Sequence, residues 1–209
     1  MVIGDSTAAS YPKPPEDRPT LTGWAQVFGE LFTDRVEVLN HATSGRSSKS
    51  FVREGRWTKA LETRPDWVFV QFGHNDQPGK GDRATDAAGD FRDYLRQYID
   101  EARAKNAKPV LVTPVARRIF SDGKPSDTLR PYADAMKAVA AEKKVPLVDL
   151  HQASLDLFAK LGDEGSADFS PSTSDRTHFS RKGAQAIARL VAAGVRREIP
   201  ELAKLLKPE

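Results

Sequence analysis

Four short polar clusters contain the residue types that acyl-transfer chemistry requires. They are Gly4-Asp5-Ser6-Thr7, Ser44-Gly45-Arg46-Ser47, Gly73-His74-Asn75-Asp76 and Asp175-Arg176-Thr177-His178. On its own, Gly-Asp-Ser is equally typical of a turn, because glycine adopts unusual backbone angles and Asp and Ser bond their own backbone. Each cluster, however, directly follows an expected strand or precedes an expected helix. Four such clusters in order favour a catalytic site over a chance arrangement.

The first and last clusters supply a nucleophile and a base. A serine hydroxyl is a poor nucleophile near neutral pH unless a base takes its proton, and imidazole is the usual base. We expect Ser6 to be the nucleophile and His178 the base. Asp175, three residues before His178, can bond Nδ1 of the imidazole and leave Nε2 free to face Ser6. The alternative is that Asp175 only caps the final helix region and His178 is a surface residue.

The two middle clusters supply hydrogen-bond donors. A tetrahedral intermediate needs donors aimed at its oxyanion, and each is worth about 3 kcal/mol of barrier in a preorganised site. We expect three such donors: the backbone amide of Ser6, the backbone amide of Gly45 and the side-chain amide of Asn75. Glycine lets the backbone approach closely, and Asn offers NH2 donors without a charge. These groups complete a predicted serine-hydrolase site.

Further polar residues lie beside this predicted machinery. Asp5 and His74 are expected to form hydrogen bonds behind the reacting groups or to contact substrate, and Arg46, with Ser47, is expected to orient the second cluster. The other charged candidates have ordinary interpretations. His41 is expected to be a packed loop residue or, alternatively, a substrate contact, and His151 has no acidic partner at a telling spacing. Arg117 and Arg118 are expected to be solvated loop cations or, alternatively, to bind a sugar or uronic acid carboxylate.

Strands and helices alternate along the chain. Short apolar runs predict five strands, at residues 1–3, 36–40, 67–72, 109–113 and 146–150. Helical spacing predicts helices over residues 24–32, 87–102, 132–140 and 180–195, with an irregular or helical passage at 49–64. Such alternation is typical of an α/β fold with a parallel sheet and helices on both faces. The four clusters then meet at the carboxyl edge of the sheet.

Length and composition limit the possible classes of protein. The chain has 209 residues, which predicts a single domain over residues 1–209. Its net charge of +3 comes without a run of like charges, so no nucleic-acid partner is indicated. Without cysteines, disulfides and thiolate metal sites are excluded. No run is apolar enough to cross a membrane. The abrupt start inside a strand suggests that upstream residues, such as an export signal, were trimmed; with such a signal we expect a secreted or periplasmic protein, and without one a cytoplasmic protein.

The four clusters resemble those of the SGNH (GDSL-like) hydrolase superfamily, whose name lists Ser, Gly, Asn and His. These correspond to Ser6, Gly45, Asn75 and His178, with Asp175 as the acid. The amino-acid sequences of the clusters are most similar to those of the rhamnogalacturonan acetylesterase branch of carbohydrate esterases. The resemblance implies a flavodoxin-like three-layer sandwich with a five-stranded parallel sheet, and removal of O-acetyl groups from plant cell-wall polysaccharide without a metal or cofactor.

Other functions are open from the sequence alone. Lipid, thioester or xylan acetate esters are alternative substrates for the same site. A metallophosphoesterase is a second reading of the Gly4-Asp5 and Gly73-His74-Asn75-Asp76 blocks, although four scattered histidines supply metal ligands poorly. A third is a non-catalytic carbohydrate-binding protein, which would need exposed aromatic side chains for stacking on sugars.

Overall fold

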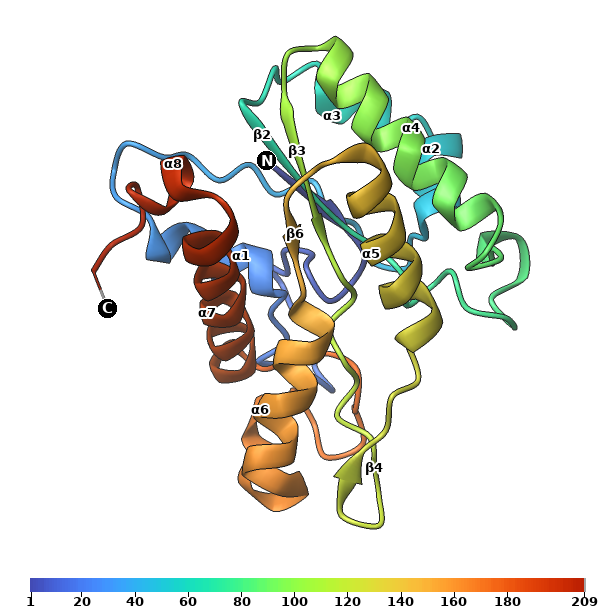
Figure 1. Cartoon of the computed structure of the whole chain (residues 1–209). Helices are drawn as coiled ribbons and strands as arrows, with labels where there is room; N and C mark the ends of the chain where they lie inside the picture. The colour runs from blue at the N-terminus through green and yellow to red at the C-terminus, as the bar shows by residue number, and fades with distance from the viewer. Residues whose placement is uncertain (209) are drawn as a thin grey trace.

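The computed structural model describes residues 1–208, which fold around one parallel sheet (Figure 1). Its strands are β1 (Val2–Gly4), β2 (Trp67–Gln71), β3 (Lys108–Val112) and β6 (Leu147–Val148), in the order β1-β2-β3-β6. The pairing is parallel throughout. Continuous apolar runs make these strands because both faces of the sheet are covered. The predicted α/β fold with a parallel sheet is confirmed.

Two layers of helices enclose the sheet, as Figure 1 shows. The helices of one layer pack their buried side chains against the sheet face that carries Val2, Phe69 and Val148. These helices are α1 (Trp24–Phe28), α6 (Leu150–Gly165), α7 (Arg181–Glu198) and α8 (Pro200–Ala203). The opposite face carries Ile3 and Val70. It is covered by α2 (Ser48–Arg53), α3 (Arg56–Leu61), α4 (Asp90–Ala104) and α5 (Arg130–Lys143). A hairpin of β4 (Phe120–Ser121) and β5 (Lys124–Pro125) extends from one end.

The predicted fifth strand at residues 36–40 does not form as a regular strand. The segment runs beside β1, where the Val2 N–H donates to the Leu39 carbonyl at 2.8 Å and the His41 N–H donates to the Val2 carbonyl at 2.9 Å. Only the Val2–Asn40 pair makes a β-bridge. On its other side, β1 pairs with β2 along all three of its residues. The sheet therefore has four regular strands, and this segment covers its edge.

Element boundaries differ from the sequence prediction where local chemistry interrupts a pattern. The passage at 49–64 forms two helices, separated at Gly55, whose φ is +70°. The helix predicted from residue 87 begins at Asp90, and Ala88 is exposed. Leu150, assigned to the last strand, instead starts α6, whose N-terminus is capped by the Asp149 side chain. No helix was predicted at α6, although its buried Leu155 and Phe158 follow helical spacing.

The turns at the carboxyl edge of the sheet bring the four polar clusters together. Ser6 follows β1 directly and His74 follows β2. The edge segment leads to Gly45, and the Thr43 N–H donates to the Gly4 carbonyl at 2.9 Å. The loop that leads into α7 returns to the same edge, where Leu21 and Ser180 form an antiparallel bridge. None of the helices within residues 1–208 is long and apolar enough to span a membrane.

Candidate active site

Ser6, His178 and Asp175 form one chain of hydrogen bonds. Nε2 of His178 lies 2.9 Å from Oγ of Ser6, across 172 positions of sequence. Nδ1 of the same imidazole lies 2.9 Å from Oδ2 of Asp175. The Ser6 residue is 7% exposed, and the side chains of His178 and Asp175 are 23% and 12% exposed. The three residues predicted to act together are therefore within proton-transfer distance, at a site that substrate can reach.

Asp175 is held as a carboxylate. Its Oδ1 accepts hydrogen bonds from the backbone N–H groups of Thr177 and His178, both at 2.9 Å. Burial by itself would raise the pKa of Asp175, but these N–H donors and the imidazole of His178 outweigh it and lower the pKa to about 2. The carboxylate therefore favours the tautomer with a proton on Nδ1 of His178. This leaves the Nε2 lone pair facing the Ser6 hydroxyl.

The three predicted oxyanion donors have distinct local supports. Gly45 has a φ of +77°, a left-handed conformation that favours glycine. Nδ2 of Asn75 donates to the Arg46 carbonyl at 3.1 Å, which fixes the side-chain amide beside the same loop. Among residues 1–208, no hydrogen bond uses the backbone N–H of Ser6 or Gly45. Both N–H groups are thus free to bind an oxygen of a substrate.

Asp76 ties the loop after β2 to the start of α2. Its carboxyl group accepts from the Gly73 N–H at 3.0 Å, the Ser48 hydroxyl at 2.5 Å and the Thr85 hydroxyl at 3.1 Å. Complete burial raises the pKa of Asp76 to about 7, although these hydrogen bonds oppose the shift. The Asn75 backbone is consequently anchored by its neighbour.

Asp5 and His74 pair behind Ser6. Oδ2 of the fully buried Asp5 lies 3.1 Å from Nδ1 of His74, and its Oδ1 accepts from the Thr7 N–H at 2.9 Å. Burial would raise the pKa of Asp5, but the His74 contacts and Thr7 bonds leave it lowered. Burial lowers the pKa of His74, against the opposing effect of Asp5. Asp5 is thus a carboxylate, beside a neutral imidazole that donates from Nδ1.

Arg46 fastens the second cluster as predicted, and Ser47 caps the helix that follows. Nη1 of Arg46 donates to the Ser44 carbonyl at 2.9 Å, and its Nε donates to Glu54 at 2.9 Å. The Ser47 side chain accepts from the Ser50 N–H, which forms a capping box at the start of α2. These contacts shape the turn on which the Gly45 N–H is presented.

Arg118 differs from its predicted role as a solvated cation. It is 3% exposed and donates to Oδ1 of Asp163 at 2.6 Å and to the hydroxyl groups of Ser166 and Ser170 at 3.0 Å. Its backbone N–H donates to the Arg176 carbonyl at 2.8 Å. The buried Arg118 side chain and backbone therefore stabilise the loop next to Asp175. Its neighbour Arg117 is half-buried, and burial lowers its pKa while the charge of Asp5 opposes that effect.

His151 has an acidic partner that is distant in the sequence. Its Nε2 lies 2.6 Å from Oδ1 of Asp127, and its Nδ1 lies 3.0 Å from the Pro114 carbonyl. His151 is buried and joins the start of α6 to the loop before α5. The sequence shows no acidic partner at a telling spacing, and the partner in the structure lies 24 positions away.

Two residues of the proline-rich loop contact the triad and were not singled out from the sequence. The Tyr11 hydroxyl donates to the Ser6 carbonyl at 2.8 Å. Nη1 of Arg18 donates to Oδ2 of Asp175 at 3.2 Å. Neither contact has a signal in the sequence, since both depend on the path of an irregular loop. That loop therefore borders the site in addition to connecting β1 with α1.

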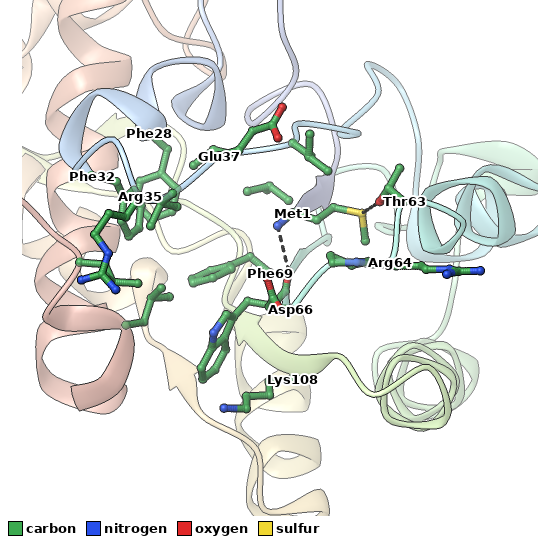
Figure 2. A pocket seen from close by; sticks show the side chains of 18 residues that line it. Met1, Phe28, Phe32, Arg35, Glu37, Thr63, Arg64, Asp66, Phe69 and Lys108 are labelled. Carbon is green, nitrogen blue, oxygen red and sulfur yellow. Dashed lines mark hydrogen bonds between the residues drawn. The ribbon is translucent and has the colours of Figure 1, made fainter.

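A cavity of about 620 Å³ lies away from this site, at the amino ends of the strands (Figure 2). Met1, Trp67 and Lys108, which begin or precede β1, β2 and β3, line it. The Met1 amino group donates to the Trp67 carbonyl at 2.9 Å, and burial lowers the pKa of this amine to about 6. Because Ser6 follows the opposite ends of these parallel strands, the cavity is separate from the triad.

Comparison with known proteins agrees with this geometry. The chain is 41% identical over 201 residues to a probable rhamnogalacturonan acetylesterase (YesY) of Bacillus subtilis, covering 93% of this chain and 91% of that protein. It is 42% identical over 210 residues to the rhamnogalacturonan acetylesterase RhgT of the same organism, covering 93% and 88%. The resemblance inferred from the four clusters is therefore confirmed.

Solved structures match the fold as well. The crystal structure of protein YxiM of Bacillus subtilis superimposes with a TM-score of 0.82 at 28% identity, covering 94% of this chain and 55% of that chain. The model of the GDSL-like lipase/acylhydrolase family matches residues 2–186, which include Ser6, Gly45, Asn75 and His178. From its sequence, its fold and the arrangement of its polar clusters, the chain belongs to the GDSL-like lipase/acylhydrolase family.

Proposed function

We propose that this chain is a serine esterase that removes O-acetyl groups from rhamnogalacturonan or a related plant polysaccharide. The observation that carries this proposal is the continuous contact from Ser6 through His178 to Asp175. The backbone N–H groups of Ser6 and Gly45, which no hydrogen bond within residues 1–208 uses, support it. Relatives that are 41% and 42% identical are named rhamnogalacturonan acetylesterases, and they support the choice of an acetylated saccharide as substrate.

The proposed reaction has two steps. His178 Nε2 takes the proton of Ser6 as Oγ attacks the acetyl carbonyl carbon, and Asp175 stabilises the resulting imidazolium. The oxyanion accepts hydrogen bonds from the Ser6 and Gly45 N–H groups and from Asn75. Collapse of this intermediate transfers the proton from His178 to the departing sugar oxygen, leaving an acetyl group on Ser6. Water, deprotonated by His178, then hydrolyses the acetyl-enzyme and releases acetate.

The two rival functions lack a supporting observation in the described part of the chain. Within residues 1–208, no three His, Cys, Asp or Glu side chains gather as a metal site requires, so nothing there favours a metallophosphoesterase. A sugar-binding protein needs exposed aromatic rings for stacking. The exposed large apolar side chain in this range is that of Ile119, which is aliphatic.

The proposal is tested by measuring acetate release from acetylated rhamnogalacturonan, acetylated xylan and a chromogenic acetate. Ser6→Ala should lower kcat on every active substrate by at least about 10⁴-fold, since the nucleophile is lost. Circular dichroism should show that the variant stays folded. Ser121→Ala, an exposed serine of the β4–β5 hairpin, is the matched control. Full activity of Ser6→Ala would refute the serine mechanism, and release from xylan alone would refute the proposed substrate.

A further inference from the structure

Arg18 contacts the predicted catalytic acid directly. Its Nη1 donates to Oδ2 of Asp175 at 3.2 Å, the same oxygen that lies 2.9 Å from Nδ1 of His178. The Arg18 side chain is 30% exposed, while that of Asp175 is 12% exposed. The guanidinium group of Arg18 is therefore the more exposed partner, and it contacts a carboxylate that is mostly buried. Proton transfer between Ser6 and His178 requires neither this contact nor its charge.

The loop that carries Arg18 is fastened at both ends to the two halves of the triad. At its start, the Tyr11 hydroxyl donates to the Ser6 carbonyl at 2.8 Å. At its end, the Thr22 N–H donates to the Phe179 carbonyl at 2.9 Å, next to His178. Between them, four prolines restrict the backbone, namely Pro12, Pro14, Pro15 and Pro19. Arg18 is thus presented to Asp175 from a backbone with little freedom.

We propose that Arg18 is a positioning residue for the Asp175–His178 pair, an inference that rests on the esterase mechanism proposed above. Oδ1 of Asp175 accepts two backbone N–H groups and also lies 3.2 Å from Nδ1 of His178, while Oδ2 accepts His178 at 2.9 Å and Arg18 at 3.2 Å. With both oxygens filled, the carboxylate has a single orientation, and the imidazole is held with Nε2 on Ser6. Without Arg18, Oδ2 keeps one donor and the proline loop loses its contact with the acid.

The positive charge of Arg18 has an opposite and smaller effect. A cation beside Asp175 disfavours the imidazolium that must form on His178 in the transition state. Because Arg18 is partly solvated, water screens this repulsion to the range of surface ion pairs, roughly a two- to fivefold change in rate. Misplacement of a catalytic group by about 1 Å can cost on the order of 100-fold. Orientation therefore outweighs charge, and the net effect of Arg18 is to accelerate the reaction.

Other titratable groups also face the pair and must be considered in a pH measurement. Asp17 lies 3.5 Å from Nε of Arg18. The charges of both Arg18 and Asp175 act on Tyr11, whose pKa is raised mainly by burial. His178 acts on His74, whose pKa is lowered mainly by burial. A substitution that removes the charge of Arg18 also removes it from Asp17 and Tyr11, so the variants are compared over full pH profiles and not at a single pH.

The test compares Arg18→Ala, Arg18→Gln and Arg18→Lys on a small chromogenic acetate. Arg18→Ala should lower kcat about tenfold with KM within about twofold, because orientation and not substrate binding is lost. The acid limb of its kcat/KM profile should move to higher pH by about half a unit, because the imidazolium loses a repulsive neighbour. Arg18→Lys should keep the limb in place. Arg18→Gln, which retains a donor without the charge, should move the limb but recover part of kcat.

Lys13→Ala, an exposed cation of the same loop, is the control and should leave both kcat and the limb unchanged. The inference is overturned if all three Arg18 variants retain wild-type kcat, or if kcat falls equally in all three while the acid limb stays fixed. The first result would show that the contact is dispensable, and the second that the role is purely structural. Either result leaves the esterase proposal standing, provided that Ser6→Ala is inactive.

Discussion

The individual residues of this site differ in how many contacts with the surrounding structure hold them in place. Ser6 needs only its position at the end of β1, whereas His178 depends on Asp175 for its tautomer and orientation. Asn75 depends on the Arg46 carbonyl to hold its amide. Arg18 adds a donor from a loop that has no other chemical function in the proposed mechanism. The positions of the proposed catalytic groups thus depend on contacts from four separate segments of the chain.

Asn75 provides a prediction at this scale. Asn75→Ala removes one oxyanion donor and should lower kcat by about 10²- to 10³-fold, with a small change in KM, because the donor acts on charge that develops in the transition state. Steady-state kinetics on acetate esters measure this. Asn75→Asp, of equal size but without the donor, is expected to be at least as slow. Wild-type kcat in either variant would remove Asn75 from the proposed oxyanion site.

The residues predicted from sequence are those whose partners are local or belong to recognisable clusters. Asp175 and His178 are three positions apart, so their pairing follows from spacing. The acidic partner of Arg118, Asp163, lies 45 positions away, and that of His151 lies 24 positions away. Such distant pairs depend on how loops cross one another. A single sequence contains no periodic signal for them, so the role of Arg118 was misjudged and the partner of His151 was not found.

At the scale of elements, the site is set by the turns at the carboxyl ends of β1 and β2. Apolar runs at residues 67–72 and 109–113 predicted the two central strands correctly, since buried parallel strands need continuous apolar sequence. The run at 36–40 was misread because it lies at the sheet edge, where none of its residues is buried and Asn40 alone forms a bridge to β1. Burial decides such a case, and burial is a property of the whole fold.

Asp76 joins two of these elements and supplies a pH-dependent prediction. Burial raises its pKa from 3.8 to about 7 in the folded chain. Between pH 4 and 7 the folded state therefore keeps a proton that the unfolded state has released. The contribution of Asp76 to the free energy of unfolding must fall as pH rises through this range, by up to about 4 kcal/mol. Above pH 7 it should change no further.

This prediction is measured by urea unfolding of the wild type and of Asp76→Asn from pH 4 to pH 8. The free energy of unfolding of the wild type minus that of the variant should fall by up to about 4 kcal/mol as pH rises to about 7 and then level off, since the variant lacks the titrating group. Asp122→Asn, an exposed carboxyl in the β4–β5 turn, controls for the loss of one negative charge. A difference that is constant from pH 4 to pH 7 would contradict the account.

At the scale of the whole molecule, the fold brings Ser6 and His178 into contact although they are 172 positions apart in the sequence. Strands and helices between β1 and α7 return the chain to the edge where it began, and Leu21 pairs with Ser180 to fix the return. Alternation of strands and helices was sufficient to predict this meeting. The exact shape of the surrounding loops was not predictable, because proline and glycine determine where a chain turns but not what it then contacts. Sugar specificity depends on those loops.

The central claim is that Ser6 carries the acetyl group during turnover. The most direct measurement is mass spectrometry of the chain after rapid acid quenching with a chromogenic acetate, followed by peptide mapping. The account predicts a mass increase of one acetyl group, located on the peptide that contains Ser6 and absent in Ser6→Ala. Accumulation of the acetyl group on a different residue, with Ser6 unmodified during turnover, would contradict it.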